Sequence, residues 1–122
     1  MILYIDTTDY KTMHFALADK AVKEKEFEIA YNENWKTLDH LKQFLKQNKT
    51  SIADITKIIV CSGPGSFNGT RVGVTIAQGL SFANKISMVA IAKDKVPTDL
   101  AKLTSFKGGK KIEIEYTSTN FN

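Results

Sequence analysis

One segment of the sequence combines residue types that can hold an anion. In the stretch CSGPGSFNGTR, Gly63 and Gly65 can adopt positive φ, and Pro64 fixes the backbone between them. Backbone N–H groups in such a turn, followed by the first turn of a helix, can bind a phosphate or a carboxylate. The spacing departs from the Walker sequence, because Thr70 and Arg71 stand where lysine and then serine or threonine are required. We therefore favour a tight, ligand-free turn from strand to helix, with an anion site as the alternative.

The sequence offers few residues for metal binding or nucleophilic catalysis. His14 lies on a predicted strand and His40 on a predicted helix, so the two histidines do not form the i, i+4 pair of a helical metal site. Ser62, Ser66 and Cys61 could act as nucleophiles, but neither histidine has a defined sequence relation to them. We expect no catalytic, metal-binding or cofactor-binding residue on this chain, and a buried, unreactive Cys61.

Length and composition indicate one folded domain. The chain has 122 residues, of which 43% are hydrophobic and 25% charged, as is typical of a globular protein rather than a disordered one. No run approaches the roughly 18 apolar residues of a transmembrane helix. The N-terminal residues lack the basic region of a signal peptide, and a single cysteine excludes an internal disulfide framework. We expect a soluble, cytoplasmic domain.

The net charge of +4 comes from one region of the chain. Residues 93–111 hold six lysines and two aspartates, a surplus of four, so the remaining residues balance to zero. A lysine cluster of this size is more often a solvated surface than a nucleic-acid site. We divide the chain into a lobe over residues 1–92 and a basic C-terminal extension over residues 93–122.

The hydrophobic pattern predicts the elements that position the glycine turn. Period-two and apolar runs predict strands, and apolar residues at helical spacing predict helices. The expected strands are 2–5, 12–18, 22–30, 57–61, 87–91 and, in the extension, 111–117; the expected helices are 34–48 and 69–84. Asn32 or Asn34 is expected to cap the first helix, and Asn68 or Ser66 the second. Three meandering strands followed by strand–helix–strand predict an α/β fold with a mixed five-stranded sheet, antiparallel and then parallel. This order is similar to the ribonuclease-H-like lobe that is repeated in actin-like ATPases.

The helix predicted at 69–84 is unusually rich in small residues. Gly69, Gly73 and Ala77 follow one another at four-residue spacing, so one stripe of the helix has almost no side chains. Each glycine inside a helix costs about 1 kcal/mol relative to alanine, so Gly73 and Gly79 need a compensating close contact. Packing against the first helix is one interpretation, and a helix-to-helix subunit interface is the one that we favour.

The segment SGPGSFNGTRVGVTIAQGLSFANKISMVAIA resembles the signature of the TsaB family, also called YeaZ. The opening Ile5-Asp6-Thr7-Thr8 is similar to that family's I-D-T-S, and the resemblance extends over about residues 1–92. Residues that match the glycine motif and its helix are Gly63, Pro64, Gly65, Ser66, Phe67, Gly69, Arg71, Gly73, Ala77, Gln78, Gly79 and Leu80. Asn68 replaces the usual threonine, and residues 33–39 keep little of the family's first-helix motif beyond Leu38.

The resemblance implies a non-catalytic dimerization subunit of the machinery that makes threonylcarbamoyladenosine in tRNA. Its implied partners are a TsaD-like catalytic subunit and a TsaE-like ATPase, which would carry the ATP and the metal, and the same helices could also pair two copies of this chain. Contact with tRNA would be indirect or weak. The residues that we expect at the partner interface are Trp35, Leu38, Leu41, Gly69, Gly73, Ala77 and Leu80. Gly73→Leu is expected to abolish partner binding while the monomer stays folded.

Two other functions remain open from the sequence. An actin-like phosphotransferase or hydrolase would use Asp6 and the turn at 63–66 on phosphate, although this chain has the length of one lobe and such sites lie between two. A turn-forming role for Asp6 is the simpler interpretation. The lysines of residues 93–111 could instead bind tRNA directly, with a steep dependence of affinity on salt.

Overall fold

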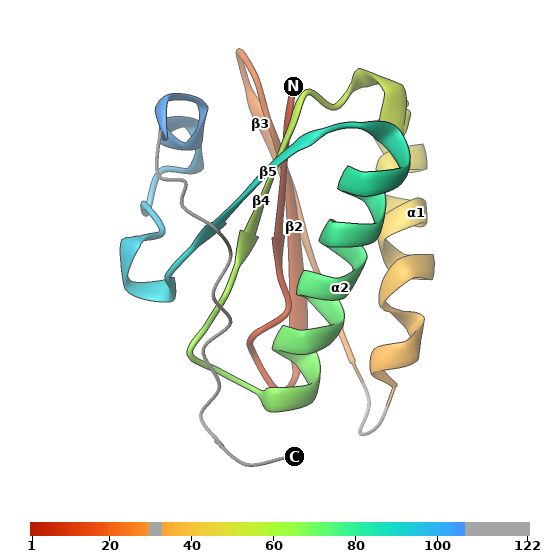
Figure 1. The fold of residues 1–122 in the computed structure, drawn as a ribbon, viewed down its shortest axis with the longest axis vertical. Coiled ribbons are helices and arrows are strands. Elements are labelled where there is room, and N and C mark those ends of the chain that lie inside the picture. The colour runs from red at the N-terminus through yellow and green to blue at the C-terminus, as the bar shows by residue number, and fades with distance from the viewer. Residues whose placement is uncertain (30–32, 107–122) are drawn as a thin grey trace.

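A computed structural model describes residues 1–29 and 33–106 of the chain. Two α-helices lie side by side on one face of a single sheet, and short 3₁₀ turns lie on the other face (Figure 1). The strand expected at 111–117 and most of the basic extension fall outside the described residues. None of the helices in the described ranges is long and apolar enough to cross a membrane.

The sheet has five strands, as the sequence predicted. The strands are β1 (Ile2–Asp6), β2 (Thr12–Ala18), β3 (Val22–Glu28), β4 (Lys57–Cys61) and β5 (Ser87–Ile91). Their order is β3-β2-β1-β4-β5; the pairs β1–β2 and β2–β3 are antiparallel, whereas β1–β4 and β4–β5 are parallel. The charged strand β3 lies at one edge, where lysine and glutamate side chains can face water. The mixed α/β architecture is therefore confirmed.

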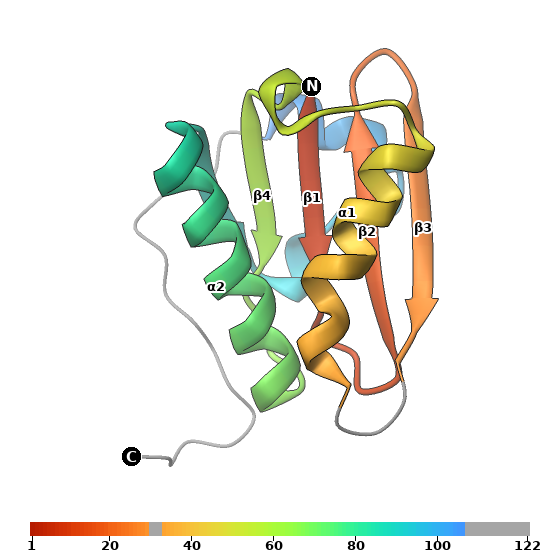
Figure 2. The same cartoon turned by 90° about the vertical axis from the view of Figure 1, so that its right-hand side faces the viewer.

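The helices cross from one strand to the next on the same side of the sheet. The 3₁₀ turn η1 (Asn34–Lys36) leads into α1 (Thr37–Gln47), and η2 (Ile52–Asp54) precedes β4. The helix α2 (Phe67–Asn84) connects β4 to β5. In Figure 2 the two helices are close at their N-terminal ends and diverge toward their C-terminal ends. The N-terminal ends meet because η1 packs on α2.

The ends of the two helices differ from the sequence-based expectation in one respect. Of the two residues expected to cap α2, Ser66 does so and Asn68 does not, since the Ser66 Oγ accepts a hydrogen bond from the Gly69 N–H at 3.2 Å. The expectation of an asparagine cap on α1 is wrong, because Lys36 precedes that helix and makes no capping hydrogen bond through its side chain. The turn η1 replaces the cap by continuing the chain into the helix.

Apolar side chains fill both sides of the sheet. On the helix side, Phe15 lies at the centre, with the rings of Phe27 and Phe44 each 5.9 Å from its own. On the opposite side, η3 (Lys93–Lys95) and η4 (Leu100–Ser105) bring Leu100 and Leu103 onto Tyr4 and its neighbours. A strand covered on both sides explains the continuous apolar runs of β1 and β4.

Candidate functional site

The outer surface of the two helices carries exposed apolar side chains. Trp35 is 71% exposed, Leu38 is 37% exposed and Phe82 is 89% exposed. Leu80 is half-buried beside α1. Single exposed apolar residues are normal, but Trp35 on η1 is three residues from Leu38 on α1, and Leu38 lines one groove together with Leu80 of α2. This grouping favours an interaction surface. Three of the residues expected at a partner interface, Trp35, Leu38 and Leu80, therefore lie where a second chain can reach them.

The small-residue row of α2 faces inward rather than outward. Gly69, Gly73 and Ala77 are buried against the rest of the chain. A Cβ at Gly73 would lie closer than 3.0 Å to Thr7 Oγ1, and Thr7 Oγ1 donates a hydrogen bond to the Gly69 carbonyl at 2.5 Å. The structure corrects the expectation that this row contacts a partner, because the close approach that glycine permits is to the segment after β1.

Leu41 requires the same correction. Its side chain is 1% exposed and packs in the core with Phe44 and Ile58. Spacing of three or four residues groups Leu38, Leu41 and Leu45 on one side of α1, but the sheet covers only part of that side. Leu41 therefore supports the surface from beneath, while Leu38 forms part of it.

A groove of about 580 Å³ opens between the diverging ends of the two helices. Its apolar floor consists of side chains from α1, η2 and α2, namely Leu38, Leu41, Leu45, Ile52 and Leu80. We call this concavity the α1–α2 groove. It is continuous with the exposed Leu38, so the apolar helix surface and the groove form one candidate binding region.

The glycine turn is closed by the protein's own backbone. The Ser66 N–H donates to the Thr8 carbonyl at 2.7 Å, and a Cβ at Gly65 would lie 2.5 Å from Thr8 Cβ. Gly63 adopts φ of 103°, as its residue type allows. The turn thus packs directly on Thr8, and the Gly69 N–H is occupied by the Ser66 cap. Thr8 and the Ser66 cap therefore hold the shape of this turn.

Asp6 serves the turn that follows β1. Its Oδ1 accepts hydrogen bonds from the Thr8 N–H at 2.9 Å and from the Thr8 hydroxyl at 2.7 Å. The Lys93 ammonium also donates to the Thr8 hydroxyl, at 2.7 Å. The sequence analysis did not include Thr7, Thr8 or Lys93 among the site residues. The turn-forming residue types after Asp6 could have indicated the two threonines. No local pattern could have indicated Lys93, because it lies 85 residues after Thr8 in the chain.

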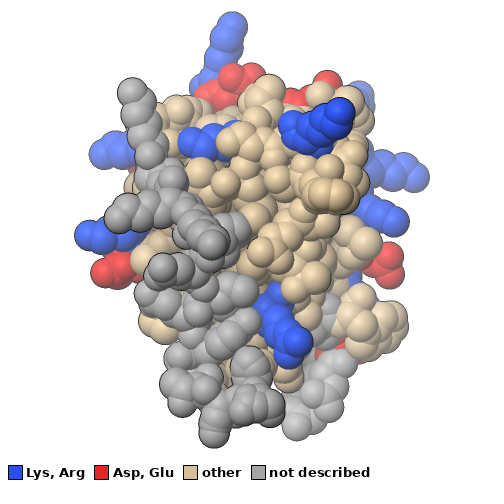
Figure 3. Space-filling model, viewed as in Figure 1, with Lys and Arg blue, Asp and Glu red and all other residues tan. Residues whose placement is uncertain are grey.

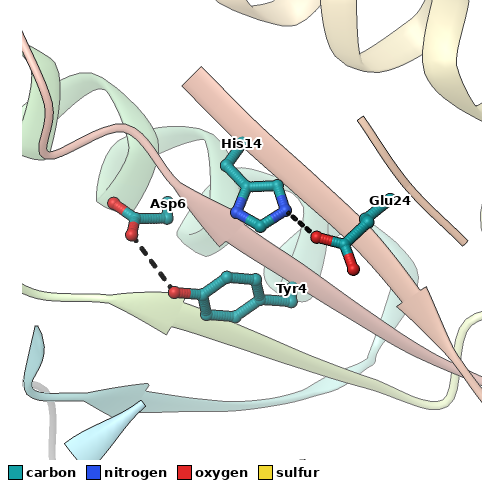
Figure 4. Close-up of polar contacts among 4 residues, drawn as sticks. All are labelled: Tyr4, Asp6, His14 and Glu24. Carbon is teal, nitrogen blue, oxygen red and sulfur yellow. Dashed lines mark hydrogen bonds and ion pairs between the residues drawn. The ribbon is translucent and has the colours of Figure 1, made fainter. Parts of the chain in front are cut away.

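A polar cluster lies on the face of the sheet opposite the two helices (Figure 4). It consists of Tyr4, Asp6, His14 and Glu24. The Tyr4 hydroxyl donates to Asp6 Oδ2 at 3.2 Å, and His14 Nε2 lies 2.9 Å from Glu24 Oε1. Burial, followed by the charge of Asp6, raises the pKa of Tyr4 far above its ordinary value. This phenol therefore stays protonated at neutral pH and acts as a hydrogen-bond donor.

Cys61 is fully buried at the end of β4, as expected. Burial raises the pKa of its thiol to about 11, with a further contribution from the charge of Asp6. The thiolate needed for nucleophilic chemistry is thus disfavoured at neutral pH. His40 stacks on Phe27 with ring centres 4.7 Å apart, and no group of three or more potential metal ligands occurs among the described residues.

The polar residues of the glycine-motif helix lie on its outer side. Arg71 and Gln78 are exposed, and the Arg71 guanidinium carbon lies 5.9 Å from the ring centre of the half-buried Phe67. Pro64 is exposed in the turn. Thr70 is different, because its buried hydroxyl has no hydrogen-bond partner within the described part of the chain.

Comparison with known proteins agrees with this geometry. The TsaD family model, described as tRNA N6-adenosine threonylcarbamoyltransferase, matches residues 29–96. The TsaB proteins of Bacillus subtilis (strain 168) and Escherichia coli (strain K12), both described as tRNA threonylcarbamoyladenosine biosynthesis proteins, are 32% and 33% identical, each over 75% of this chain. The chain belongs to the TsaB/YeaZ branch of this family. The solved structure of YeaZ from Pseudomonas aeruginosa shares the fold, with a TM-score of 0.67, 23% identity and coverage of 75% of this chain and 43% of its own.

The chain spans about two fifths of the length of these TsaB relatives, 40% and 39% respectively. The match to TsaB therefore concerns the actin-like, ribonuclease-H-like lobe that is described above. The glycine turn, α1 and α2 all fall within the residues that the family model matches.

Proposed function

We propose that this domain acts in the biosynthesis of threonylcarbamoyladenosine in tRNA as a non-catalytic accessory subunit. The observation that carries the proposal is the pairing of an exposed apolar helix surface, around Trp35 and Leu38, with a glycine turn that is closed by Thr8. The surface offers a place for a partner, while the turn offers no open anion cradle. Similarity to proteins named for this pathway supplies the biological context.

The proposed partner is a TsaD-like catalytic subunit that docks on α1 and α2. In this arrangement the partner subunits, including a TsaE-like ATPase, hold the nucleotide and the metal. The complex acts in the cytoplasm, and tRNA is the substrate of its catalytic subunit. Contact with tRNA is indirect. On the face shown in Figure 3, Lys and Arg side chains project at several separate places around the molecule.

Co-purification with the host's TsaD-like subunit, followed by measurement of the assembly mass, tests the proposal. Trp35 is the only tryptophan of this chain and is largely exposed, so its emission should shift to shorter wavelength when the partner covers it. Leu38→Asp should weaken the complex at least tenfold, since it places a charge in a desolvated interface. Thr104→Asp, on η4 across the sheet, is the matched control and should leave affinity unchanged.

Four results would contradict the proposal. If no complex forms at micromolar concentrations, the TsaD-like subunit is not the partner. If Leu38→Asp and Thr104→Asp bind the TsaD-like subunit with equal affinity, the helix surface around Leu38 is not the interface. ATP hydrolysis by the isolated domain would favour an actin-like phosphotransferase or hydrolase that uses Asp6 and the turn at 63–66. A mass equal to two copies of this chain, with no bound partner, would show that the helices form a homodimer instead.

A further inference from the structure

A row of lysines borders the α1–α2 groove. Lys42, Lys46 and Lys49 all line it, and they follow one another at steps of four and three residues. Lys42 and Lys46 lie about one helical turn, or roughly 5.4 Å, apart along α1, and Lys49 follows just beyond the end of that helix. The lysine row therefore runs beside the apolar floor contributed by Leu38 and Leu45.

The charge on this border is unbalanced. Among the residues that the structure describes, none of the three lysines forms an ion pair. Asp54 is the acidic residue on the lining, and its carboxylate already accepts a hydrogen bond from the Ser51 N–H at 2.9 Å. Three cations against one occupied carboxylate leave a positive border that attracts negative charge.

The two hydroxyl groups on the groove lining, those of Thr50 and Ser51, each take part in a local hydrogen bond. Ser51 Oγ accepts from the Ala53 N–H at 3.1 Å, and Thr50 Oγ1 donates to the Asn48 carbonyl at 3.0 Å. Small-molecule sites usually present a few polar groups that converge on the ligand. An apolar floor with a cationic border instead resembles the grooves that accept one face of an amphipathic helix.

We propose that the α1–α2 groove binds an acidic amphipathic helix of the partner subunit. Apolar side chains of that helix, three or four residues apart, fill the floor between Leu38, Ile52 and Leu80. Its carboxylates, about one turn apart, face the lysine row. This inference rests on the proposed function for the partner's identity, and it specifies the chemistry of the partner surface.

The backbone of Lys49 supplies a variant that removes charge without weakening the fold. Lys49 has φ of 51°, a left-handed conformation that disfavours residues with a Cβ. Lys49→Gly therefore deletes one member of the lysine row and relieves backbone strain. Lys85 has the same conformation, with φ of 55°, at the end of α2 and does not line the groove, so Lys85→Gly is the matched control.

The first experiment measures affinity for the host's TsaD-like subunit by calorimetry at about 0.05 M and about 0.5 M salt. At low salt, Lys42→Glu/Lys46→Glu should weaken binding at least tenfold and Lys49→Gly about threefold, whereas Lys85→Gly and Lys85→Glu should change it less than twofold. At high salt the differences should shrink, because exposed charges are screened. Equal effects at Lys49 and Lys85 would overturn the inference, and loss of binding only in Leu38→Asp would leave the proposed function standing without it.

The second experiment does not depend on the TsaD-like subunit. A synthetic helical peptide with leucine on one side and glutamate at one-turn spacing is titrated into the isotope-labelled domain, and a peptide with lysine in place of glutamate is the control. The acidic peptide should shift the methyl signals of Leu38 and Leu45 at concentrations at least tenfold lower than the basic peptide. Equal shifts with both peptides, or none with either, would refute the groove's preference for an acidic helix, whatever the TsaD-like subunit does.

Discussion

Gly73→Ala should destabilise the domain, although alanine is ordinarily the better helix former. The added Cβ would overlap Thr7 Oγ1 and lie 3.3 Å from Thr7 Cβ and Cγ2. Overpacking of this kind costs about 1–3 kcal/mol, and rotation of the Thr7 hydroxyl away from the Gly69 carbonyl adds about 1–2 kcal/mol. The gain in helix propensity offsets about 1 kcal/mol. We expect a net loss of about 1–4 kcal/mol in the free energy of unfolding.

Urea denaturation followed by far-ultraviolet circular dichroism measures this loss, and Gly79→Ala on the same helix is its control. The close contact expected at Gly79 is absent from the described residues, where a Cβ at this position meets nothing within 4 Å. Gly79→Ala should therefore be stabilised by up to about 1 kcal/mol. Thr7→Ala should largely remove the cost of Gly73→Ala, because the overlapping hydroxyl is gone, and a double-mutant cycle reports this coupling. Equal stability of Gly73→Ala and Gly79→Ala would refute the inward orientation of the row.

The same geometry replaces the sequence-based expectation for Gly73→Leu. That variant was expected to separate binding from folding, but a leucine side chain has no space between α2 and Thr7. Loss of partner binding in Gly73→Leu would therefore reflect loss of the fold. Leu38→Asp is the variant that tests the interface.

Three further changes have defined outcomes. Lys85→Gly should raise the unfolding free energy by about 1 kcal/mol in urea titrations, because glycine adopts the left-handed conformation at this helix end without strain; no change would contradict that assignment. Thr70→Val should raise it by about 1–2 kcal/mol in the same assay by removing a buried hydroxyl without a partner in the described residues, and a loss would reveal a hydrogen bond to some other group. Stability should fall as pH rises from about 9 to about 11, because the Cys61 thiol ionises near 9.0 when unfolded but near 11 when folded; Cys61→Ala should show a shallower fall, and identical pH profiles would contradict the burial effect.

The sequence predicted the fold well because local patterns carry the relevant physics. The alternation of Met13, Phe15 and Leu17 predicts one buried side of β2, and those residues do lie on the helix side of the sheet. The apolar run of β4 predicts a strand covered on both sides, and helices and 3₁₀ turns cover it. The sequence offered Ser66 and Asn68 as caps because both side chains can bind the free N–H groups of a helix start, and the structure selects Ser66.

The candidate site was predicted less well because its contacts join distant segments. Glycine spacing in α2 predicts a close approach but not the element that approaches, and Thr7 lies 62 residues before the carbonyl that it binds. The α1–α2 groove likewise needs Ile52 and Leu80 from separate elements. Residues on the same side of α1 also differ in exposure, since Leu41 is buried whereas Leu38 is not, and their spacing in the sequence does not predict this difference. Such differences depend on where the sheet ends beneath each helix.

The position of β1 has a consequence for synthesis of the chain. Its antiparallel partner β2 follows within a few residues, but its parallel partner β4 begins 55 residues after Ile2. During vectorial synthesis the meander of three strands can pair early, while the other edge of β1 keeps its backbone groups unpaired until residues 57–61 emerge. An unpaired apolar edge is prone to aggregation. Ribosome-bound nascent chains that end before β4 should therefore be the form of this domain most dependent on chaperones.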